Sequence, residues 1–306
     1  MGASAKLVAC MRKTTRRDYE ERLRLVIAKI AQGLDAPADL GALAEAAGFS
    51  LYPFHRIFRA MTGESVAAFQ RRLRLERAAS RLSAEGWPVG VVALEAGFDS
   101  PESFCRAFRT AYGVPPSRFA AETGGRWHPL PAPNGAHWPD PAQGWSLREP
   151  QGEPMQVEIR NEPGFRLAAI RHIGPYDRIG EAFDRLFAWA QSKGLPLRAP
   201  IAVYHDDPST TPEAELRSDA GIVVDTDFVA DDPSIHVLEV PAQRCAVAIH
   251  RGPYEGLPES WAKFLGEWLP QSGEEVGEGL CYERYLNDCL GLPPEELITE
   301  MVEPLR

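Results

Sequence analysis

A carboxylate and a set of aromatic rings in the C-terminal half are the residues best suited to bind a small molecule. Glu283 lies two residues before Tyr285, so in an extended strand the two side chains would share one face. A carboxylate among aromatic rings suits a lipophilic cation, because the negative charge and the ring faces both attract positive charge. The predicted ligand-binding residues are Glu283, Tyr285, Tyr204, Tyr176, Tyr254, Trp261 and Phe183.

Each of these residues also has a structural interpretation. Glu283 could lie at a strand edge in water, and core filling explains Phe183 and Trp261 equally well. His172 and His250 precede matching turns, which favours structural hydrogen bonds over catalysis or metal binding. The sequence shows no Cys/His cluster, phosphate loop or nucleophile elbow, so we predict no catalytic residue, no metal and no cofactor.

Two short N-terminal segments place basic and polar residues where they could contact duplex DNA. A helix that reads DNA buries one face and presents hydrogen-bond donors to base edges from the other. Phe54, Ile57 and Phe58 form the apolar face of the first segment, and Phe104 and Phe108 that of the second. The predicted DNA-binding residues on the outer faces are Tyr52, His55, Arg56, Arg59, Glu102, Ser103, Arg106 and Arg109.

The residue types indicate different contacts. Arg56 and Arg106 occupy matching positions in the two copies and could form a bidentate hydrogen bond to guanine or contact a phosphate. Tyr52 and His55 could contact thymine methyl groups, and Glu102 could accept from a cytosine amine or simply be tolerated in the groove. Four arginines between the segments suit phosphate clamps or salt bridges better than base reading: Arg71, Arg72, Arg74 and Arg77.

An internal repeat predicts the elements that hold these residues. Ala47-Gly48-Phe49 recurs as Ala96-Gly97-Phe98, and Phe54-x-Arg56-x-Phe58 recurs as Phe104-x-Arg106-x-Phe108. Helical spacing of apolar residues surrounds both copies, and each glycine stands where a helix would end. We therefore predict two helix-turn-helix units over residues 17–122, joined by a long Arg-rich helix near residues 66–85.

A second, different repeat organises the C-terminal half. Arg166–Tyr176 is echoed by Arg244–Tyr254, and each copy contains an apolar run, a Gly-Pro-Tyr turn and an amphipathic helix. Further on, Tyr204 matches Tyr285, whereas Glu283 matches Ala202. We predict an α+β domain over residues 155–306, built from two duplicated halves about a pseudo-two-fold axis with a cleft between them.

The segment between the repeats and the charge distribution support a division into two domains. Residues 123–154 carry seven prolines and five glycines without a periodic apolar pattern, which predicts a linker. Residues 1–126 hold 19 Lys+Arg against 13 Asp+Glu, a net charge of +6. Because the whole chain has a net charge of −10, the remaining residues have a net charge of −16. A basic first part is compatible with a nucleic-acid partner.

Both repeats resemble known families. The first, which ends in Gly113-Val114-Pro115-Pro116-Ser117-Arg118-Phe119, resembles the AraC/XylS family of double helix-turn-helix regulators. The second resembles the GyrI-like effector-binding fold in its two Gly-Pro-Tyr turns, in Tyr204–Pro208 and in Tyr282–Asp288. The order, DNA reader first and sensor last, is similar to the Rob-type arrangement. The resemblance places Tyr52, His55, Arg56, Glu102, Ser103 and Arg106 at base-contacting positions and Glu283 at the glutamate that GyrI-like sensors use.

These resemblances imply a DNA-binding transcription regulator, not an enzyme, whose C-terminal domain senses a small aromatic or cationic lipophilic molecule. The expected partners are promoter DNA, the small-molecule effector and RNA polymerase. Two alternatives remain: the C-terminal domain could be a small-molecule hydrolase, with Glu283 activating water, or a protein-interaction module without a ligand. Apolar runs are too short to span a membrane and the start does not resemble a secretory signal, so we expect a cytoplasmic protein.

Overall fold

The computed structural model describes residues 2–84, 86–147, 150, 153–197, 200–206, 208, 211–287 and 291–306, with only the backbone described for residues 2–15, 52 and 84. The chain divides into two compact units, one formed by Arg16–Glu149 and one that contains Pro150–Arg306. Each unit is described separately below.

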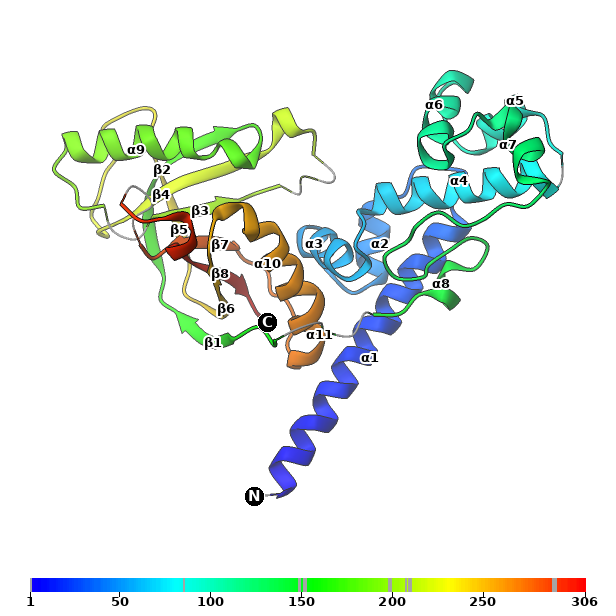
Figure 1. Cartoon of the computed structure of the whole chain (residues 1–306). Helices are drawn as coiled ribbons and strands as arrows, with labels where there is room; N and C mark the ends of the chain where they lie inside the picture. The colour runs from blue at the N-terminus through cyan, green and yellow to red at the C-terminus, as the bar shows by residue number, and fades with distance from the viewer. Residues whose placement is uncertain are drawn as a thin grey trace. The chain divides into compact units, whose positions relative to one another are not determined.

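The first unit is entirely helical in its regular structure (Figure 1). The two helix-turn-helix units are α2–α3 and α5–α6, and α4 joins them. The helices are α1 (Gly2–Gln32), which belongs to this unit from Arg16 onward, α2 (Leu40–Ala46), α3 (Leu51–Thr62), α4 (Val66–Ala84), α5 (Val89–Glu95), α6 (Pro101–Tyr112), α7 (Pro116–Thr123) and α8 (Pro141–Gly144). The predicted all-α double helix-turn-helix fold is therefore confirmed.

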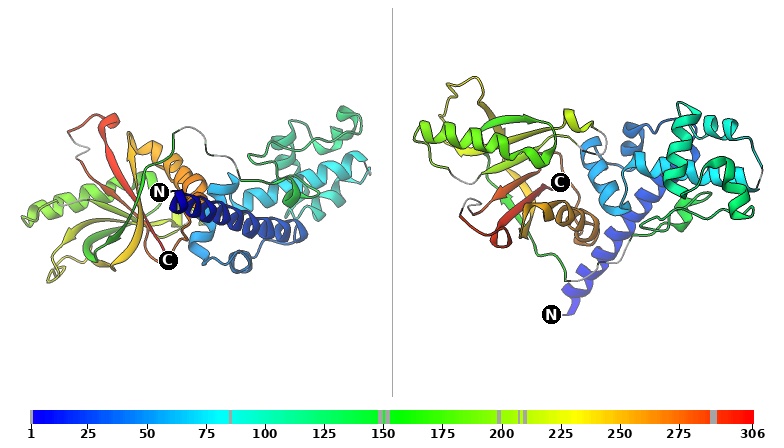
Figure 2. Two further views of the ribbon diagram at one scale, coloured as in Figure 1. Left: turned by 90° about the horizontal axis from the view of Figure 1, so that it is seen from below. Right: turned by 45° about the horizontal axis from the view of Figure 1, so that its top comes forward.

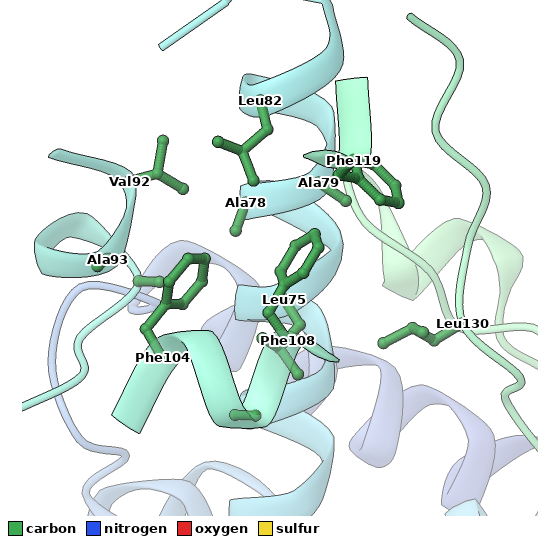
Figure 3. Packing of buried hydrophobic residues seen from close by; sticks show 12 residues of the cluster. Leu75, Ala78, Ala79, Leu82, Val92, Ala93, Phe104, Phe108, Phe119 and Leu130 are labelled. Carbon is green, nitrogen blue, oxygen red and sulfur yellow. The ribbon is translucent and has the colours of Figure 1, made fainter. Parts of the chain in front are cut away.

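Phenylalanines from both copies form the core of this unit. Phe104 and Phe108 of α6 are fully buried, and they pack with Phe119 of α7 against the apolar face of α4 (Figure 3). In the first copy, Phe54 and Phe58 of α3 are equally buried. Burying an aromatic side chain contributes roughly 2–3 kcal/mol, so these rings fix how α3 and α6 pack.

Arg74 of α4 contacts the segment before α2 and the turn between α5 and α6. Arg74 donates from Nε to the Leu34 carbonyl oxygen and from Nη2 to that of Ala36, both at 2.7 Å. Its guanidinium also covers Gly97, where an added Cβ would lie only 2.9 Å from the guanidinium carbon. Gly97 has φ +69°, a left-handed backbone conformation that favours glycine, whereas the Arg74 guanidinium could shift to make room for a side chain. The segment after α1 and the turn between α5 and α6 therefore share one cation.

The segment that follows α7 packs against the helical unit instead of forming a free linker. Glu76 of α4 is fully buried and accepts hydrogen bonds from the backbone N–H groups of Leu130 (3.0 Å) and Trp138 (2.9 Å). The Asn134 side chain donates to the Thr62 carbonyl oxygen at 2.6 Å, and Trp145 is 1% exposed. We call residues 124–147 the strap. Composition predicted a linker over 123–154, but the strap is bound through side chains that lie far from it in sequence.

The second unit is an eight-stranded antiparallel sheet with helices from both sequence halves on one face (Figure 1). The strand order is β1-β6-β8-β7-β3-β4-β2-β5. If β1–β4 are exchanged with β5–β8, the same order is obtained when the sheet is read from its other edge, which agrees with the predicted pseudo-two-fold axis. The strands are β1 (Val157–Glu162), β2 (Phe165–Ile173), β3 (Ile201–Tyr204), β4 (Arg217–Val224), β5 (His236–Val240), β6 (Gln243–Arg251), β7 (Tyr282–Tyr285) and β8 (Ile298–Pro304). The predicted duplicated α+β fold is confirmed.

Helices cover one face of this sheet. The longer covering helix is α9 (Gly180–Ser192), which packs on β2 and β4. In the second half, α10 (Leu257–Lys263), a π-helical turn (Phe264–Trp268) and α11 (Leu269–Ser272) follow one another and pack near β6 and β8. Short 3₁₀ turns complete the unit: Tyr176–Arg178, Glu213–Glu215, Tyr254–Gly256 and Pro294–Glu296.

The strands of the sheet curl (Figure 2). The opposite face carries a second apolar cluster and a group of ion pairs. Arg284 of β7 reaches Glu162 of β1 at 2.6 Å, although β8 and β6 lie between these strands in the sheet. Arg284 also pairs with Glu300 at 2.6 Å, and Arg160 pairs with Glu300 at 2.8 Å. These contacts across the curl stabilise the curvature that shapes the helix-covered face.

Candidate functional site

The strand register places Glu283 near the centre of the helix-covered face. In antiparallel strands, directly opposed residues point to the same face. Glu283 lies opposite Ala202 of β3 on one side and Met301 of β8 on the other. The same row continues through apolar residues of the other strands: Ile170, Ala220, Ala248 and Val157. Glu283 is thus a carboxylate in a row of apolar side chains across seven strands.

Three neutral donors hold the Glu283 carboxylate. The hydroxyls of Tyr204 and Tyr285 donate to Oε2 at 2.7 and 3.0 Å, and the indole Nε1 of Trp261 donates to Oε1 at 2.8 Å. The residue is 3% exposed. The alternative in which Glu283 lies at a strand edge in water is therefore wrong, because β7 is an interior strand of the sheet.

The remaining predicted ligand-binding residues surround these donors. The Tyr176 ring lies 4.8 Å from the Tyr204 ring, centroid to centroid. The rings of Tyr254 and Phe183 lie 5.1 and 5.6 Å from the ring of Tyr285. All seven predicted residues therefore belong to one connected cluster, which we call the Glu283 cluster.

The Glu283 cluster lies where the apolar cores of the two halves meet. Tyr204, Tyr285 and Phe183 belong to the core under α9, whereas Trp261 and Tyr254 belong to the core under α10. Each half therefore contributes donors to the same carboxylate. Movement of one half against the other would change the hydrogen bonds of Glu283.

Burial and charge keep the two tyrosines protonated. Burial, followed by the negative charge of Glu283, raises the pKa of Tyr204 well above its usual value, and the same two causes raise the pKa of Tyr285. Both hydroxyls therefore act as donors at neutral pH. The cluster therefore places two neutral phenol donors on one carboxylate.

The two histidines that precede the turns have structural roles. His172 Nε2 lies 2.9 Å from the Pro175 carbonyl oxygen, and His250 Nε2 lies 3.0 Å from that of Pro253. His250 Nδ1 also lies 2.8 Å from the Ser260 hydroxyl. The predicted structural hydrogen bonds are thus present in both halves, and they fix the turns that carry Tyr176 and Tyr254.

In the first reading helix, α3, arginines lie on the outer side. Arg56 is about 200° around the helix from the buried Phe54, and Arg59 is exposed. His55, predicted on the outer face, is only 6% exposed, so that orientation is wrong. Its position is within about 60° of Phe58, at the flank of the apolar face. The side chain of Tyr52 lies outside the described residues.

In the second reading helix, α6, Glu102, Arg106 and Arg109 are exposed and follow one outer stripe. Ser103 instead forms the capping box at the start of the helix. Its hydroxyl donates to the Ser100 carbonyl oxygen at 2.8 Å, and its N–H donates to the Ser100 hydroxyl at 3.1 Å. Ser103 was predicted to face DNA, but its side chain is already used to begin α6.

Salt bridges occupy most of the arginines of α4. Arg72 pairs with Glu64 at 2.9 Å, and Arg77 pairs with Asp35 at 2.8 Å. Arg74 holds the backbone after α1, as described above. Arg71 differs from these three, because it is exposed and has no carboxylate within 4 Å in the described part of the chain.

Within the residues that the structure describes, no group of three or more His, Cys, Asp or Glu side chains could hold a metal ion. In the same residues, no helix is both long and apolar enough to cross a membrane.

Comparison with known proteins assigns both units. Residues 155–306 match the family model of the GyrI-like small molecule binding domain. A DNA gyrase inhibitor of Serratia proteamaculans (strain 568) is 34% identical over 142 residues, which cover 44% of this chain and 89% of that protein. The chain belongs to the GyrI-like family. The DNA gyrase inhibitor of Escherichia coli (strain K12) is 30% identical over 137 residues, 44% of this chain and 87% of that protein.

The N-terminal unit carries the second domain. Residues 43–122 match the helix-turn-helix domain model, of the AraC type. The chain thus joins a helix-turn-helix DNA-binding domain to a GyrI-like small-molecule-binding domain. This domain organisation is that of a transcription regulator that senses a small molecule.

Solved structures with a similar fold include two of EcmrR. The EcmrR–DNA complex has a TM-score of 0.43 and 19% identity, over 49% of this chain and 57% of that chain. The EcmrR C-terminal domain has a TM-score of 0.40 and 19% identity, over 50% of this chain and 98% of that one. A hydrolase from Listeria innocua has a TM-score of 0.37 and 16% identity, over 51% of this chain and 94% of that one.

Proposed function

We propose that the GyrI-like domain is a receptor for a lipophilic organic cation and that Glu283 is its charged receptor group. The observation that carries the proposal is a carboxylate, 3% exposed, that accepts hydrogen bonds from two phenols and an indole in the middle of an aromatic cluster. A carboxylate and aromatic ring faces both attract positive charge, so this environment favours a lipophilic cation as the ligand.

The aromatic rings define the kind of cation. Tyr176, Tyr254 and Phe183 add ring faces around the donors, and such faces favour a cation with aromatic or alkyl substituents. The three donors must yield at least one hydrogen bond when the cation approaches the carboxylate. Trp261 is the natural reporter, because its indole N–H is bound to Glu283 directly.

Binding of the cation changes the affinity of the N-terminal domain for its operator. In that domain Arg56, Arg59, Arg106 and Arg109 contact DNA, with Arg56 and Arg106 as base readers at matching positions of α3 and α6. Glu102, beside Arg106 on the outer stripe, accepts from a cytosine amine. The regulator acts on transcription at a promoter, where RNA polymerase is the further partner.

The domain acts as a receptor and not as an enzyme. Both oxygens of Glu283 already accept hydrogen bonds, so the carboxylate is engaged and is poorly suited to take a proton from water. The hydrolase alternative requires a bound water on Glu283 and turnover that depends on this residue.

Titration of the full chain with tetraphenylphosphonium, followed by tryptophan fluorescence and calorimetry, tests the proposal. We expect saturable binding, weakened by about 2–3 kcal/mol or on the order of 100-fold in Glu283→Gln, because the charge is lost while the shape is kept. Glu259→Gln, an exposed carboxyl on α10, serves as the matched control and should bind as the wild type does. Equal affinity of the wild type and Glu283→Gln, or chemical conversion of the probe, would contradict the receptor proposal.

A further inference from the structure

The α4 helix exposes very little of its surface. Its five arginines are Arg71, Arg72, Arg74, Arg77 and Arg81, and all except Arg71 make an ion pair or a hydrogen bond within the unit. Among the described side chains of α4, only Ala67, Ala68 and Arg71 are exposed. The solvent-facing part of the helix is therefore a short stripe of two small residues and one cation.

A hollow adjoins this stripe within the same unit. It has a volume of about 650 Å³ and lies between α4, the turn that contains Gly97, and α6. Arg71 and Arg74 line it from α4, Asp99 from the turn, and Arg106, Ser103 and Thr110 from α6. Three guanidinium groups against one carboxylate leave the walls with a charge of +2, which favours an anion.

The arginines, and not the hydroxyls, must provide the donors for that anion. The Ser103 hydroxyl donates to the Ser100 carbonyl oxygen at 2.8 Å, and the Thr110 hydroxyl donates to that of Arg106 at 2.9 Å. Arg74 uses two of its N–H groups on backbone oxygens. Arg71 keeps its donors, and its guanidinium carbon lies 5.9 Å from the centre of the Phe98 ring, a contact that holds the side chain at the hollow.

The position of the hollow points to the DNA backbone as the source of the anion. The 19-residue α4 is about 28 Å long and joins the two reading helices. Two helices that enter successive major grooves, about 34 Å apart, leave a phosphate backbone to pass beside the helix that joins them. Ala67 and Ala68 are small enough to let that backbone approach, and Arg71 follows them on the same stripe.

We propose that Arg71 and this hollow bind a backbone phosphate of the operator, next to the base step that Arg106 reads. This inference rests on the proposed DNA-binding function and adds a residue that contributes affinity without sequence information. Arg72 and Arg77 form ion pairs within the fold, and Arg74 adds charge to the hollow while it holds backbone oxygens, so of these four arginines Arg71 is the main phosphate donor.

The test measures DNA affinity of the full chain against salt concentration, on a duplex selected from a randomised pool and on a random duplex. For Arg71→Ala we expect about 10-fold weaker binding to both duplexes and a slope of log affinity against log salt that is smaller by about 1. Arg71→Lys should keep the slope, because it keeps the charge. Arg17→Ala, with the 79% exposed Arg17 on α1, is the control and should leave the slope unchanged.

The outcomes separate this inference from the function on which it rests. If the wild type does not distinguish the selected duplex from the random one, the DNA-reading function fails, and this inference fails with it. If the wild type does distinguish them, an unchanged slope in Arg71→Ala, or a loss confined to the selected duplex, overturns the phosphate site alone. Circular dichroism of each variant confirms that the exposed substitution leaves the fold intact.

Discussion

Glu283 of β7 lies directly opposite Ala202 of β3, so the pseudo-two-fold axis relates a buried carboxylate to a methyl group. Both positions face the same helix-covered side, and the tyrosines two residues further on, Tyr204 and Tyr285, both donate to the single carboxylate. Duplication thus supplies a symmetric pair of phenol donors, and one substitution within it supplies the charge. The asymmetry is what makes a cation site possible at the junction of the halves.

Removing one phenol donor should separate stability from binding. Tyr285→Phe loses a hydrogen bond to a charged group, so we expect the free energy of unfolding to fall by about 1.5–3 kcal/mol. The same change leaves Glu283 less well satisfied, so the affinity for tetraphenylphosphonium should rise. Urea unfolding and calorimetric titration of the same preparation measure both quantities. Unchanged cation binding would show that the Tyr285 hydroxyl is not coupled to the receptor site, and weaker binding would contradict the expected gain in affinity.

Arg106 should contribute to sequence preference as well as to affinity. Arg106→Ala is expected to weaken binding to the selected duplex by about 1–3 kcal/mol and binding to random duplex by less, because a bidentate contact to a base is lost. Parallel gel-shift titrations on both duplexes measure the difference. Equal losses on the two duplexes would make Arg106 a second backbone contact.

The strap should behave as part of the helical unit. Glu76→Gln keeps the size of the side chain but loses the charge that Arg72 and three strap donors share, so we expect about 3–5 kcal/mol of destabilisation. Glu45→Gln, an exposed carboxyl on α2, is the control. Thermal unfolding provides the measurement. If Glu76→Gln unfolds at the temperature of the wild type, the strap adds nothing to the unit.

A buried aspartate should give the sheet unit a defined acid sensitivity. Burial alone would raise the pKa of Asp219, but hydrogen bonds from His205 and Arg171 outweigh it and lower the pKa to about 2. Because the folded pKa is below the unfolded value of about 3.9, this stabilisation is complete above about pH 4 and is lost as the pH falls toward 2.

We therefore expect Asp219→Asn to destabilise the protein at pH 6 and to differ less from the wild type at pH 3. Urea unfolding at the two pH values measures the difference, and Asp225→Asn, an exposed carboxyl just after β4, is the control. If the difference in the free energy of unfolding between the wild type and Asp219→Asn is the same at pH 6 and pH 3, the ion pairs of Asp219 are not its cause.

The duplications made much of the fold predictable from the sequence. Two copies of Ala-Gly-Phe and of the phenylalanine pairs fixed both helix-turn-helix units, since a repeated pattern is unlikely to arise from chance spacing. The match of Glu283 with Ala202 likewise identified the carboxylate that the structure finds buried. The contacts between Glu283 and Trp261 required the fold, because they depend on how α10 packs.

Two side chains in the reading helices show where residue type alone was insufficient. His55 is polar and next to a buried phenylalanine, and its equivalent in the second copy is Cys105, which packs against the second core. Comparing these two positions would have indicated a core-flanking place. Ser103 follows Ser100 by three residues, a spacing typical of a capping box, and this signal was available in the sequence.

The packing of the strap was not predicted, for a different reason. Its prolines and glycines prevent a periodic pattern, and periodicity is the signal from which packing is inferred. Its order comes from Glu76, 54 residues before Leu130, and from Thr62, 72 residues before Asn134. Such distant polar contacts leave no trace in local composition.

The most direct measurement is the affinity of the full chain for its selected duplex, with and without saturating tetraphenylphosphonium, in the wild type and in Glu283→Gln. The account predicts that the wild type prefers the selected duplex over random DNA and that the cation changes this affinity by about 5-fold or more. In Glu283→Gln the preference should persist while the response to the cation disappears. A wild type whose DNA affinity is identical with and without bound cation would contradict the account.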